Sequence, residues 1–189
     1  MQKPNNYDSV SVGGFQPVVP GGHYMTVLRV VEQKNKNGGD MIVVAFDFDQ
    51  KDIQPGYFKD LFEGDDKPNK KWPYQGTQYI NVLTKTGDCT KSFKQFCYYV
   101  EKSNGFKIDW DSSDFCRQFR GRKIGGVFGR VEHEYNGKVT MRTELRWFCE
   151  YENVADAKVP EERMLNKAAA SAAPAAPKPT DPFDDDVPF

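Results

Sequence analysis

Residues 123–148 read KIGGVFGRVEHEYNGKVTMRTELRWF and carry the strongest short-range structural signal in the chain. Asn136-Gly137 separates two stretches rich in β-branched and aromatic residues. Asn-Gly is the preferred dipeptide of a two-residue hairpin turn, because both turn positions need a positive φ. The segment therefore predicts a β-hairpin with strands at Lys123–Tyr135 and Lys138–Phe148.

A two-residue turn also determines which residues of this hairpin face each other. Phe128 would oppose Leu145 and Gly126 would oppose Trp147, which predicts a core face that includes Trp147. Nearer the turn, Glu132 would oppose a methionine, and this mixes charge into the apolar face. A β-bulge would shift the register and repair part of the mismatch, but the pattern does not give its position.

Three further strands and one helix are predicted before the hairpin. Strands at Gly22–Glu32, Met41–Asp49 and Gln78–Thr84 follow from β-branched and aromatic residues, and a Gly-Gly turn joins the first two. Residues Thr90–Ser103 have apolar side chains at helical spacing, with Thr90 or Asp88 as N-cap and an Asn-Gly stop. The apolar positions of this helix are Phe93, Phe96, Cys97 and Val100.

The resulting order, three strands, a helix and two strands, decides the predicted fold. It is the layout of the OB-fold, a mainly β five-stranded barrel with a helix between strands 3 and 4. An α+β sandwich would give the same order of elements. Glycines at 125, 126 and 129 suit a barrel, because glycine permits sharp coiling and bulges. The expected core phenylalanines are Phe46, Phe48, Phe93, Phe96, Phe119 and Phe128.

The composition changes after Val154 and divides the chain into three parts. Residues 1–154 form the predicted OB-fold domain. Residues 155–180 include the run AAASAAPAAPK and are interpreted as a flexible Ala/Pro-rich linker, since Ala and Pro cannot close a core and proline prevents a continuous helix. Residues 181–189, DPFDDDVPF, form an acidic tip with two phenylalanines. We expect the linker and the tip to form a disordered C-terminal tail.

The acidic tip has the chemistry of a docking peptide. Phe189 carries both an aromatic ring and the terminal carboxylate, so a partner could bury the ring and hold the carboxylate with Arg or Lys. The preceding aspartates would steer the tip toward a basic surface. We therefore interpret it as a partner-docking segment rather than an inert solvating tail.

The net charge of the whole chain conceals a basic body. Lys plus Arg total 26 and Asp plus Glu total 27, a formal net charge of -1, which on its face argues against a nucleic-acid binder. The tip holds four aspartates and no cation, so the rest of the chain carries +3. Because +3 is small, aromatic stacking would have to contribute to binding beside electrostatics.

Several protein classes are disfavoured by what the sequence lacks. No apolar run approaches the roughly 20 residues that span a bilayer, and Met1–Asn6 has no apolar segment of signal-peptide type. Cys89, Cys97, Cys116 and Cys149 are widely spaced, which favours reduced thiols over disulfides or a zinc site. We expect a cytoplasmic protein that uses no membrane, metal or cofactor.

No catalytic constellation is evident, so we expect no enzyme activity. His23 and His133 each lie inside a predicted strand and are interpreted as ordinary strand residues. Asp47 and Asp49 share one face of a strand, as paired metal-binding carboxylates do in nucleases. No third ligand accompanies them, and we interpret them as solvent-facing.

Aromatic and cationic residues are interleaved in several segments, as binding of single-stranded DNA requires. Bases stack on exposed rings while phosphates lie in a positive groove. The candidate single-stranded-DNA-binding residues are Tyr57, Phe58, Lys59, Lys70, Lys71, Trp72, Tyr74, Arg120, Arg122, Lys123, Arg142, Arg146 and Phe148. For Tyr57, Trp72 and Tyr74, which lie in predicted loops, burial and base stacking are equally compatible with the pattern.

The tip Asp184-Asp185-Asp186-Val187-Pro188-Phe189 resembles the acidic C-terminal peptide of bacterial single-stranded DNA-binding proteins. The layout of OB domain, Ala/Pro linker and acidic tip is also similar to theirs. The body is longer, with a large insertion before the third strand, and is more similar to phage-encoded members of that family.

The resemblance implies that the six tip residues recruit replication and repair enzymes, but it assigns no DNA contact in the body. It also leaves open whether the chain is a homo-oligomer. A phage-encoded protein would act in the cytoplasm of a bacterial host. We expect sequence-independent binding and protection of single-stranded DNA in replication, recombination and repair. The alternatives are an accessory protein that acts mainly through protein–protein contacts and, less favoured, a metal-dependent nuclease that uses Asp47 and Asp49.

Overall fold

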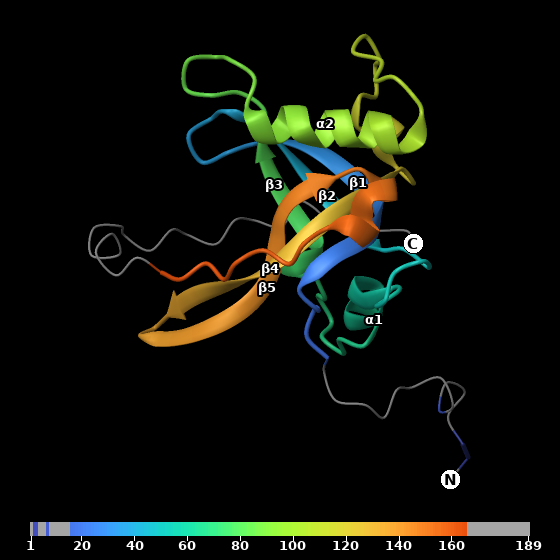
Figure 1. Ribbon diagram of the computed structural model, residues 1–189, viewed down its shortest axis with the longest axis vertical. Coiled ribbons are helices and arrows are strands. Elements are labelled where there is room, and N and C mark those ends of the chain that lie inside the picture. Colours follow the sequence, from blue (N-terminus) through green and yellow to red (C-terminus); the bar gives the residue numbers. More distant parts are fainter. Residues whose placement is uncertain (1, 4–6, 8–15, 166–189) are drawn as a thin grey trace.

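The computed structural model describes residues 2–3, 7 and 16–165. Five antiparallel strands form one sheet in the order β3-β2-β1-β4-β5, and the sheet curls around a core with helices at its two ends (Figure 1). The strands are β1 (Gly21–Lys34), β2 (Asp40–Phe48), β3 (Thr77–Asn81), β4 (Lys123–Tyr135) and β5 (Lys138–Cys149). The helices are α1 (Tyr57–Glu63) and α2 (Lys91–Asn104), and the 3-10 helices are η1 (Tyr74–Gly76), η2 (Cys116–Phe119) and η3 (Tyr151–Asp156). The mainly β class and the helix between the third and fourth strands are confirmed.

Helix α2 confirms the sequence prediction in its position and in its buried face. The Thr90 hydroxyl accepts a hydrogen bond from the Phe93 N–H at 3.2 Å, and Gly105 ends the helix at φ 61°. Its buried side chains are the four apolar residues expected from the helical spacing.

Helix α1 lies in a stretch for which no regular structure was predicted. The carboxylate of Asp47 accepts hydrogen bonds from the N–H groups of Phe58 at 2.9 Å and Lys59 at 3.2 Å, in the first turn of α1. These donors are otherwise without partners inside a helix. Because the capping residue belongs to β2, the local sequence of α1 contains no capping signal.

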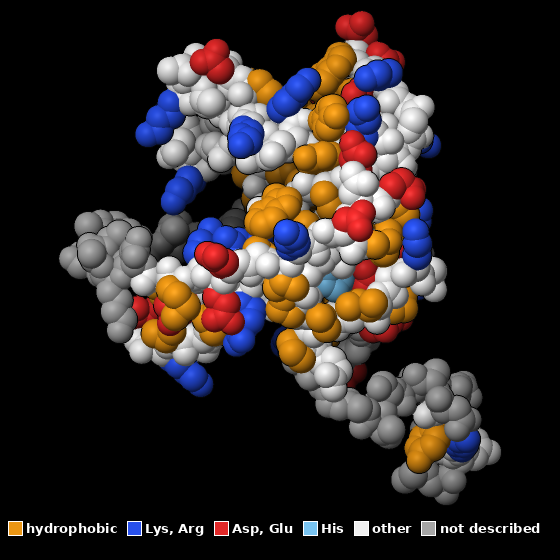
Figure 2. Space-filling view, in the orientation of Figure 1, with side chains coloured by type: hydrophobic (Ala, Val, Ile, Leu, Met, Phe, Trp, Pro, Cys, Tyr) orange, Lys and Arg blue, Asp and Glu red, His pale blue; other side chains and the backbone are white. Residues whose placement is uncertain are grey.

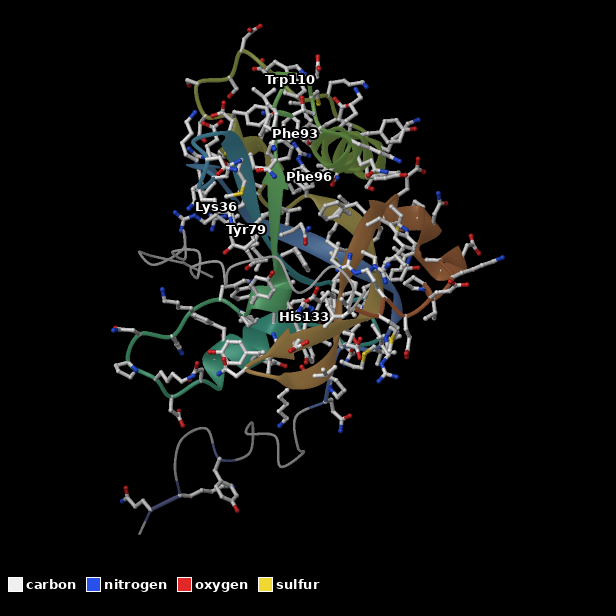
Figure 3. All side chains as sticks on the ribbon, turned by 90° about the vertical axis from the view of Figure 1, so that its left-hand side faces the viewer. Lys36, Tyr79, Phe93, Phe96, Trp110 and His133 are labelled. Atoms are coloured by element: carbon white, nitrogen blue, oxygen red, sulfur yellow. The ribbon has the colours of Figure 1, made fainter. Side chains whose placement is uncertain are left out.

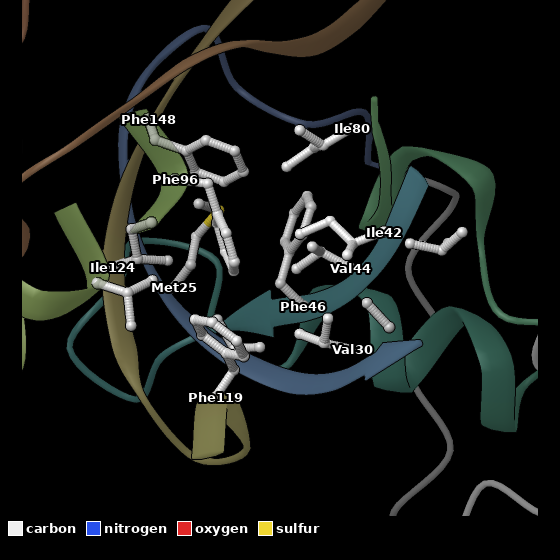
Figure 4. Packing of buried hydrophobic residues seen from close by; sticks show 14 of the residues in the cluster. Met25, Val30, Ile42, Val44, Phe46, Ile80, Phe96, Phe119, Ile124 and Phe148 are labelled. Atoms are coloured by element: carbon white, nitrogen blue, oxygen red, sulfur yellow. The ribbon is translucent and has the colours of Figure 1, made fainter. Parts of the chain in front are cut away.

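The core fills the inside of the curled sheet (Figure 4). All six phenylalanines that were expected in the core are buried. Phe96 of α2 packs on Phe119 and Phe148 at ring-centroid distances of 5.3 and 5.4 Å. Phe58 of α1 packs on Phe46 and Phe48 at 5.7 and 4.9 Å. The two helices therefore close opposite ends of the core.

The β4–β5 hairpin has the predicted turn and, in part, the predicted register. Asn136 and Gly137 have φ values of 51° and 73°, and Phe128 opposes Leu145. A shift between Val127 and Phe128 then places Val127 opposite Trp147. The expected pairing of Gly126 with Trp147 is therefore wrong.

The cause is a bulge that leaves Arg146 as the extra residue in β5. One extra residue moves every later side chain to the opposite face of a strand. Phe148 consequently points into the core, and Trp147, which we expected there, is 43% exposed.

The chain after β5 packs against the outside of the sheet. Val154 of η3 is buried, and glycines leave room for the segment that follows. A Cβ atom on Gly22 would lie 2.3 Å from the Val154 carbonyl oxygen, and one on Gly129 would lie 2.4 Å from Pro160 Cγ. Residues 155–165, the start of the predicted linker, thus lie along the sheet, while residues 166–189, including the acidic tip, are outside the described residues.

Candidate nucleic-acid interface

A groove separates the two edge strands of the sheet. It consists of two adjoining hollows with volumes of about 310 and 630 Å³, and Tyr74 and Gln75 of η1 line both of them. No ladder joins β3 to β5 within the part of the chain that the structure describes. The Gln75 side-chain amide donates a hydrogen bond of 2.7 Å to the Thr143 carbonyl oxygen of β5. The smaller hollow lies between η1–β3 and β5, and the larger one lies between η1, the β4–β5 hairpin and the segment that contains Pro17, Val18 and Pro20. We call the two hollows together the β3–β5 groove.

Arginines dominate the charge of the groove. Among the residues described as lining it are four arginines and one carboxylate, that of Glu144. The groove arginines are Arg130, Arg142, Arg146 and Arg163. In Figure 2, blue side chains gather where the β4–β5 hairpin joins the body. The arrangement is a compact cationic surface suited to phosphates.

The groove's single carboxylate has a histidine neighbour. Glu144 Oε1 lies 2.9 Å from Nε2 of His133, which is labelled in Figure 3 together with Tyr79 of β3. Because four arginines line the groove with this one carboxylate, the charge of the described lining is cationic even with Glu144 ionised.

Two tyrosine rings provide flat apolar surface beside these charges. Tyr74 is 61% exposed, and its ring lies 28° from parallel to that of Tyr79, with 6.4 Å between the centroids. Partial burial and the nearby Glu144 carboxylate raise the pKa of Tyr74, so its phenol is neutral at physiological pH. Neutral aromatic faces beside arginines can accept stacked bases.

The position of Tyr74 follows from how its neighbours are buried. Trp72 donates its indole N–H to the Gly76 carbonyl oxygen at 3.0 Å and is 5% exposed. A Cβ on Gly76 would lie 2.7 Å from that indole nitrogen, so only glycine fits there. The buried Trp72 anchors η1 and leaves the Tyr74 ring outside the core.

Of the thirteen predicted DNA-binding residues, the groove contains Tyr74, Arg142 and Arg146. The rings of Phe58, Trp72 and Phe148 are buried in the core instead. Tyr57 is half-buried on α1, with its ring 5.1 Å from that of Phe58. These four aromatic rings face the core because the ends of the curled sheet and the η1 turn must be filled with apolar side chains.

The other predicted cations lie away from the groove. Lys59 forms an ion pair with Glu63 at 3.7 Å, and the Lys70 ammonium lies 4.9 Å from the centre of the Phe62 ring. The remaining residues of this group are Lys71 and Arg120, which are exposed, Arg122, which lies over the Phe106 ring, and Lys123, which pairs with Asp49. None of them is among the described lining residues.

Three aromatic or cationic lining residues were absent from the sequence-based set. Tyr79 precedes the buried Ile80 in β3, so strand alternation indicated an outward ring. Arg130 lies in β4 and Arg163 in the predicted linker. No local motif connects these three positions, because the sheet brings them together from three separate segments.

The two aspartates considered as metal ligands have structural contacts, and the expectation that they face solvent is wrong, since Asp47 is buried and the Asp49 side chain is 11% exposed. Burial raises the pKa of Asp47, which caps α1. Burial would also raise the pKa of Asp49, but hydrogen bonds from Lys123, the Lys51 N–H and Thr26 lower it to about 2. In residues 2–3, 7 and 16–165, no group of three His, Cys, Asp or Glu side chains is placed to hold a metal ion.

Two comparisons with known proteins give no match. It matches no protein-family model, and a search of characterised proteins finds no significant match. No helix in the described part of the chain is both long enough and apolar enough to cross a membrane. The functional argument therefore rests on the residues of the groove.

Proposed function

We propose that this protein binds and protects single-stranded DNA without sequence preference during replication, recombination and repair. The observation that carries the proposal is the β3–β5 groove, whose lining includes four arginines and the rings of Tyr74 and Tyr79, which lie 28° from parallel. Single-strand binding uses this combination, because every base has a face that can stack and every nucleotide has a phosphate.

The proposal includes the finer fold assignment, an OB-fold with an open seam. The strand order β3-β2-β1-β4-β5 is that of a five-stranded barrel cut between β3 and β5. OB-folds are partly open barrels that bind oligonucleotides on one side. The groove lies along this seam, where a bound strand would contact both edges of the sheet.

The groove residues divide the binding task between charge and stacking. Arg142 and Arg146 would each donate hydrogen bonds to phosphate oxygens, while Tyr74 and Tyr79 would stack on bases. Contacts of these two kinds carry little sequence information. The binding mode thus accounts for the proposed lack of sequence preference.

The acidic tip would recruit partner proteins to the bound DNA. Its four aspartates and two phenylalanines suit a partner with a basic pocket, and the linker would let a bound partner reach the DNA. Membership of the single-stranded DNA-binding protein family, in its phage-encoded form, is part of this proposal. It is supported by the tip sequence and by the order of the three parts of the chain.

The central test compares two exposed tyrosines of the full-length chain. Tyr74 lies in the groove, and Tyr135, 67% exposed at the hairpin tip, is not among the groove residues. Anisotropy titrations of labelled dT and mixed-sequence oligonucleotides should give similar affinities that fall as salt rises. Tyr74→Ala should weaken binding by about 1–3 kcal/mol, whereas Tyr135→Ala should leave it unchanged.

Two outcomes of this experiment would refute the proposal. One is no binding by the wild-type chain at low salt, and the other is an equal loss in both variants. Deleting residues 181–189 tests the tip separately. It should leave DNA affinity intact or raise it, because the tip's aspartates compete with DNA for cations.

A further inference from the structure

The segment that follows η3 takes the place of a missing strand beside β4. Strand β1 pairs with β4 only as far as Phe128. Beyond that point the Arg163 N–H donates a hydrogen bond to the Arg130 carbonyl oxygen at 3.0 Å, and the Glu132 N–H donates one to the Arg163 carbonyl oxygen at 2.8 Å. The pairing is parallel. We call residues 157–165 the strap.

Further contacts fit the strap to this edge of β4. The Glu162 carboxylate pairs with Arg130 at 2.9 Å, and the Glu161 carbonyl oxygen accepts a hydrogen bond from Arg146 at 3.2 Å. The Leu165 N–H donates one of 2.9 Å to the Glu132 carboxylate. Each of these contacts is polar, and the side chains at 161–164 are exposed. Ala157 and Pro160 pack over Gly22 and Gly129, whereas residues 161–165 of the strap are attached to β4 and β5 by a few polar contacts.

The strap also completes the groove. The side chain of Arg163 lines the hollow between β3 and β5 together with Arg146 and Tyr79. The Arg163 backbone that carries this side chain is held by its pairing with β4. The position of a groove cation thus depends on a segment outside the five strands.

We propose that Arg163 is a phosphate-binding residue of the groove and that bound single-stranded nucleic acid clamps the strap onto β4. A ligand that contacts Arg163 binds the protein while the strap is paired with β4, and not while the strap is detached. It therefore stabilises the paired state by the difference between its affinities for the two states. Clamping would also fix the point at which the linker to the acidic tip leaves the body. This inference rests on the proposed function and adds to it a coupling between the groove and the tail.

The strap's contacts with groove arginines involve Arg130 and Arg146. The Glu162 carboxylate pairs with Arg130, which lines the larger hollow, whereas Arg163 lines the smaller one. The Glu161 carbonyl oxygen occupies one donor of Arg146, and a guanidinium has five. Arg163 and the remaining donors of Arg146 are left to face a phosphate from neighbouring positions.

The first experiment compares two arginines in the full-length protein. Arg163→Gln should weaken binding of a labelled dT oligonucleotide roughly fivefold at low salt and reduce the salt slope by about 0.7, the value for one lost phosphate contact to a single strand. Arg117→Gln makes the same charge change at η2, where the exposed Arg117 is outside the groove. It should change neither quantity. Equal effects in the two variants would overturn the inference.

The second experiment follows the strap itself by hydrogen exchange of the full chain with and without saturating dT oligonucleotide. Exchange of the Arg163 and Leu165 amides, which donate to β4 groups, should slow when DNA is bound. Unchanged or faster exchange while anisotropy reports bound DNA would overturn the clamp and leave the proposed function standing. Absence of DNA binding by the wild-type chain would overturn both.

Discussion

The curled sheet is closed where β1 pairs with β4, and it is open between its edge strands β3 and β5. We call these two places the closed seam and the open seam. At the β1–β4 seam, Gly126 pairs with His23 and Gly22 pairs with Val127. At the β3–β5 seam, long polar or aromatic side chains such as Tyr74, Gln75 and Arg146 face each other across a groove. Glycine at Gly22 lets the covering segment approach the closed seam, whereas no ladder joins the described residues of β3 and β5 at the open seam.

The closed seam also satisfies its buried polar groups internally. His23 is fully buried, stacks on Phe48 at 4.2 Å, and its ring nitrogens lie 2.9 Å from Asp52 and 2.7 Å from the Val19 carbonyl oxygen. Buried polar groups without partners would be costly. The arginines of the open seam are instead accessible to a ligand. The comparison indicates that stability resides at one seam and binding at the other.

The largest expected effect comes from the core beneath the closed seam. Phe128 is fully buried against Phe48 at 5.3 Å and His23 at 5.0 Å. Phe128→Ala should lower the free energy of unfolding by about 3–5 kcal/mol, because it removes apolar burial and leaves a cavity. Urea denaturation followed by circular dichroism measures this. Tyr135→Ala is the exposed control. If Phe128→Ala lowers the free energy of unfolding no more than this control does, the inference that stability resides at the closed seam is contradicted.

A smaller loss is expected where a covering segment meets the closed seam. Gly22→Ala would place a Cβ 2.3 Å from the Val154 carbonyl oxygen and 2.9 Å from Ala157 Cβ. Relief requires a backbone shift, so the variant should lose about 1–3 kcal/mol of stability. Limited proteolysis should cut near residue 157 faster than in the wild-type chain. Unchanged stability and cleavage would show that η3 and the strap do not pack tightly there.

Much of the fold outside the groove could be predicted from sequence, because its signals are local. The Asn136-Gly137 turn, the spacing of apolar residues in α2 and the core phenylalanines each follow from a few adjacent residues. The bulge at Arg146 does not, since it arises when Phe148 must meet Phe96 of α2. The cap of α1 is likewise supplied by Asp47, eleven residues before Phe58.

The open seam was less predictable because its residues come together only in the folded chain. Trp72 and Tyr74 look alike in sequence, yet one is buried and the other exposed. Trp72 is the buried one, because Gly76 has no side chain and leaves space for the indole. Arg163 lies in an apparent linker, and only the unpaired edge of β4 explains its place in the groove.

The contrast between Trp72 and Tyr74 gives a third test, on stability rather than binding. Trp72→Phe removes the indole donor to Gly76 and some buried volume, so it should lose about 1–2 kcal/mol of unfolding free energy. The affinity of the folded fraction for a dT oligonucleotide should stay unchanged. Thermal unfolding and anisotropy separate the two effects. A Trp72→Phe variant that keeps full stability but binds DNA poorly would place Trp72, not Tyr74, in the binding surface.

The smallest expected effect is a pH dependence confined to the closed seam. Asp49 follows β2 and joins Thr26 of β1 to Lys123 of β4. Burial acts to raise the pKa of Asp49, but Lys123 and its other donors lower it from 3.8 to about 2. A carboxylate with a depressed folded pKa stabilises the fold above its unfolded pKa, and this contribution disappears as the pH falls from about 4 to about 2. After allowance for solvent screening, about 1 kcal/mol is expected.

Asp49→Asn isolates this contribution, because the raised pKa of Asp47 acts in the opposite direction in both proteins and cancels in the comparison. Wild type should exceed the variant in unfolding free energy at pH 6, and the difference should vanish near pH 2. The groove arginines stay charged throughout this range, so acid should weaken the closed seam while the cations of the open seam are unchanged. A difference between wild type and variant that is independent of pH would mean that Asp49 contributes through packing and not through its charge.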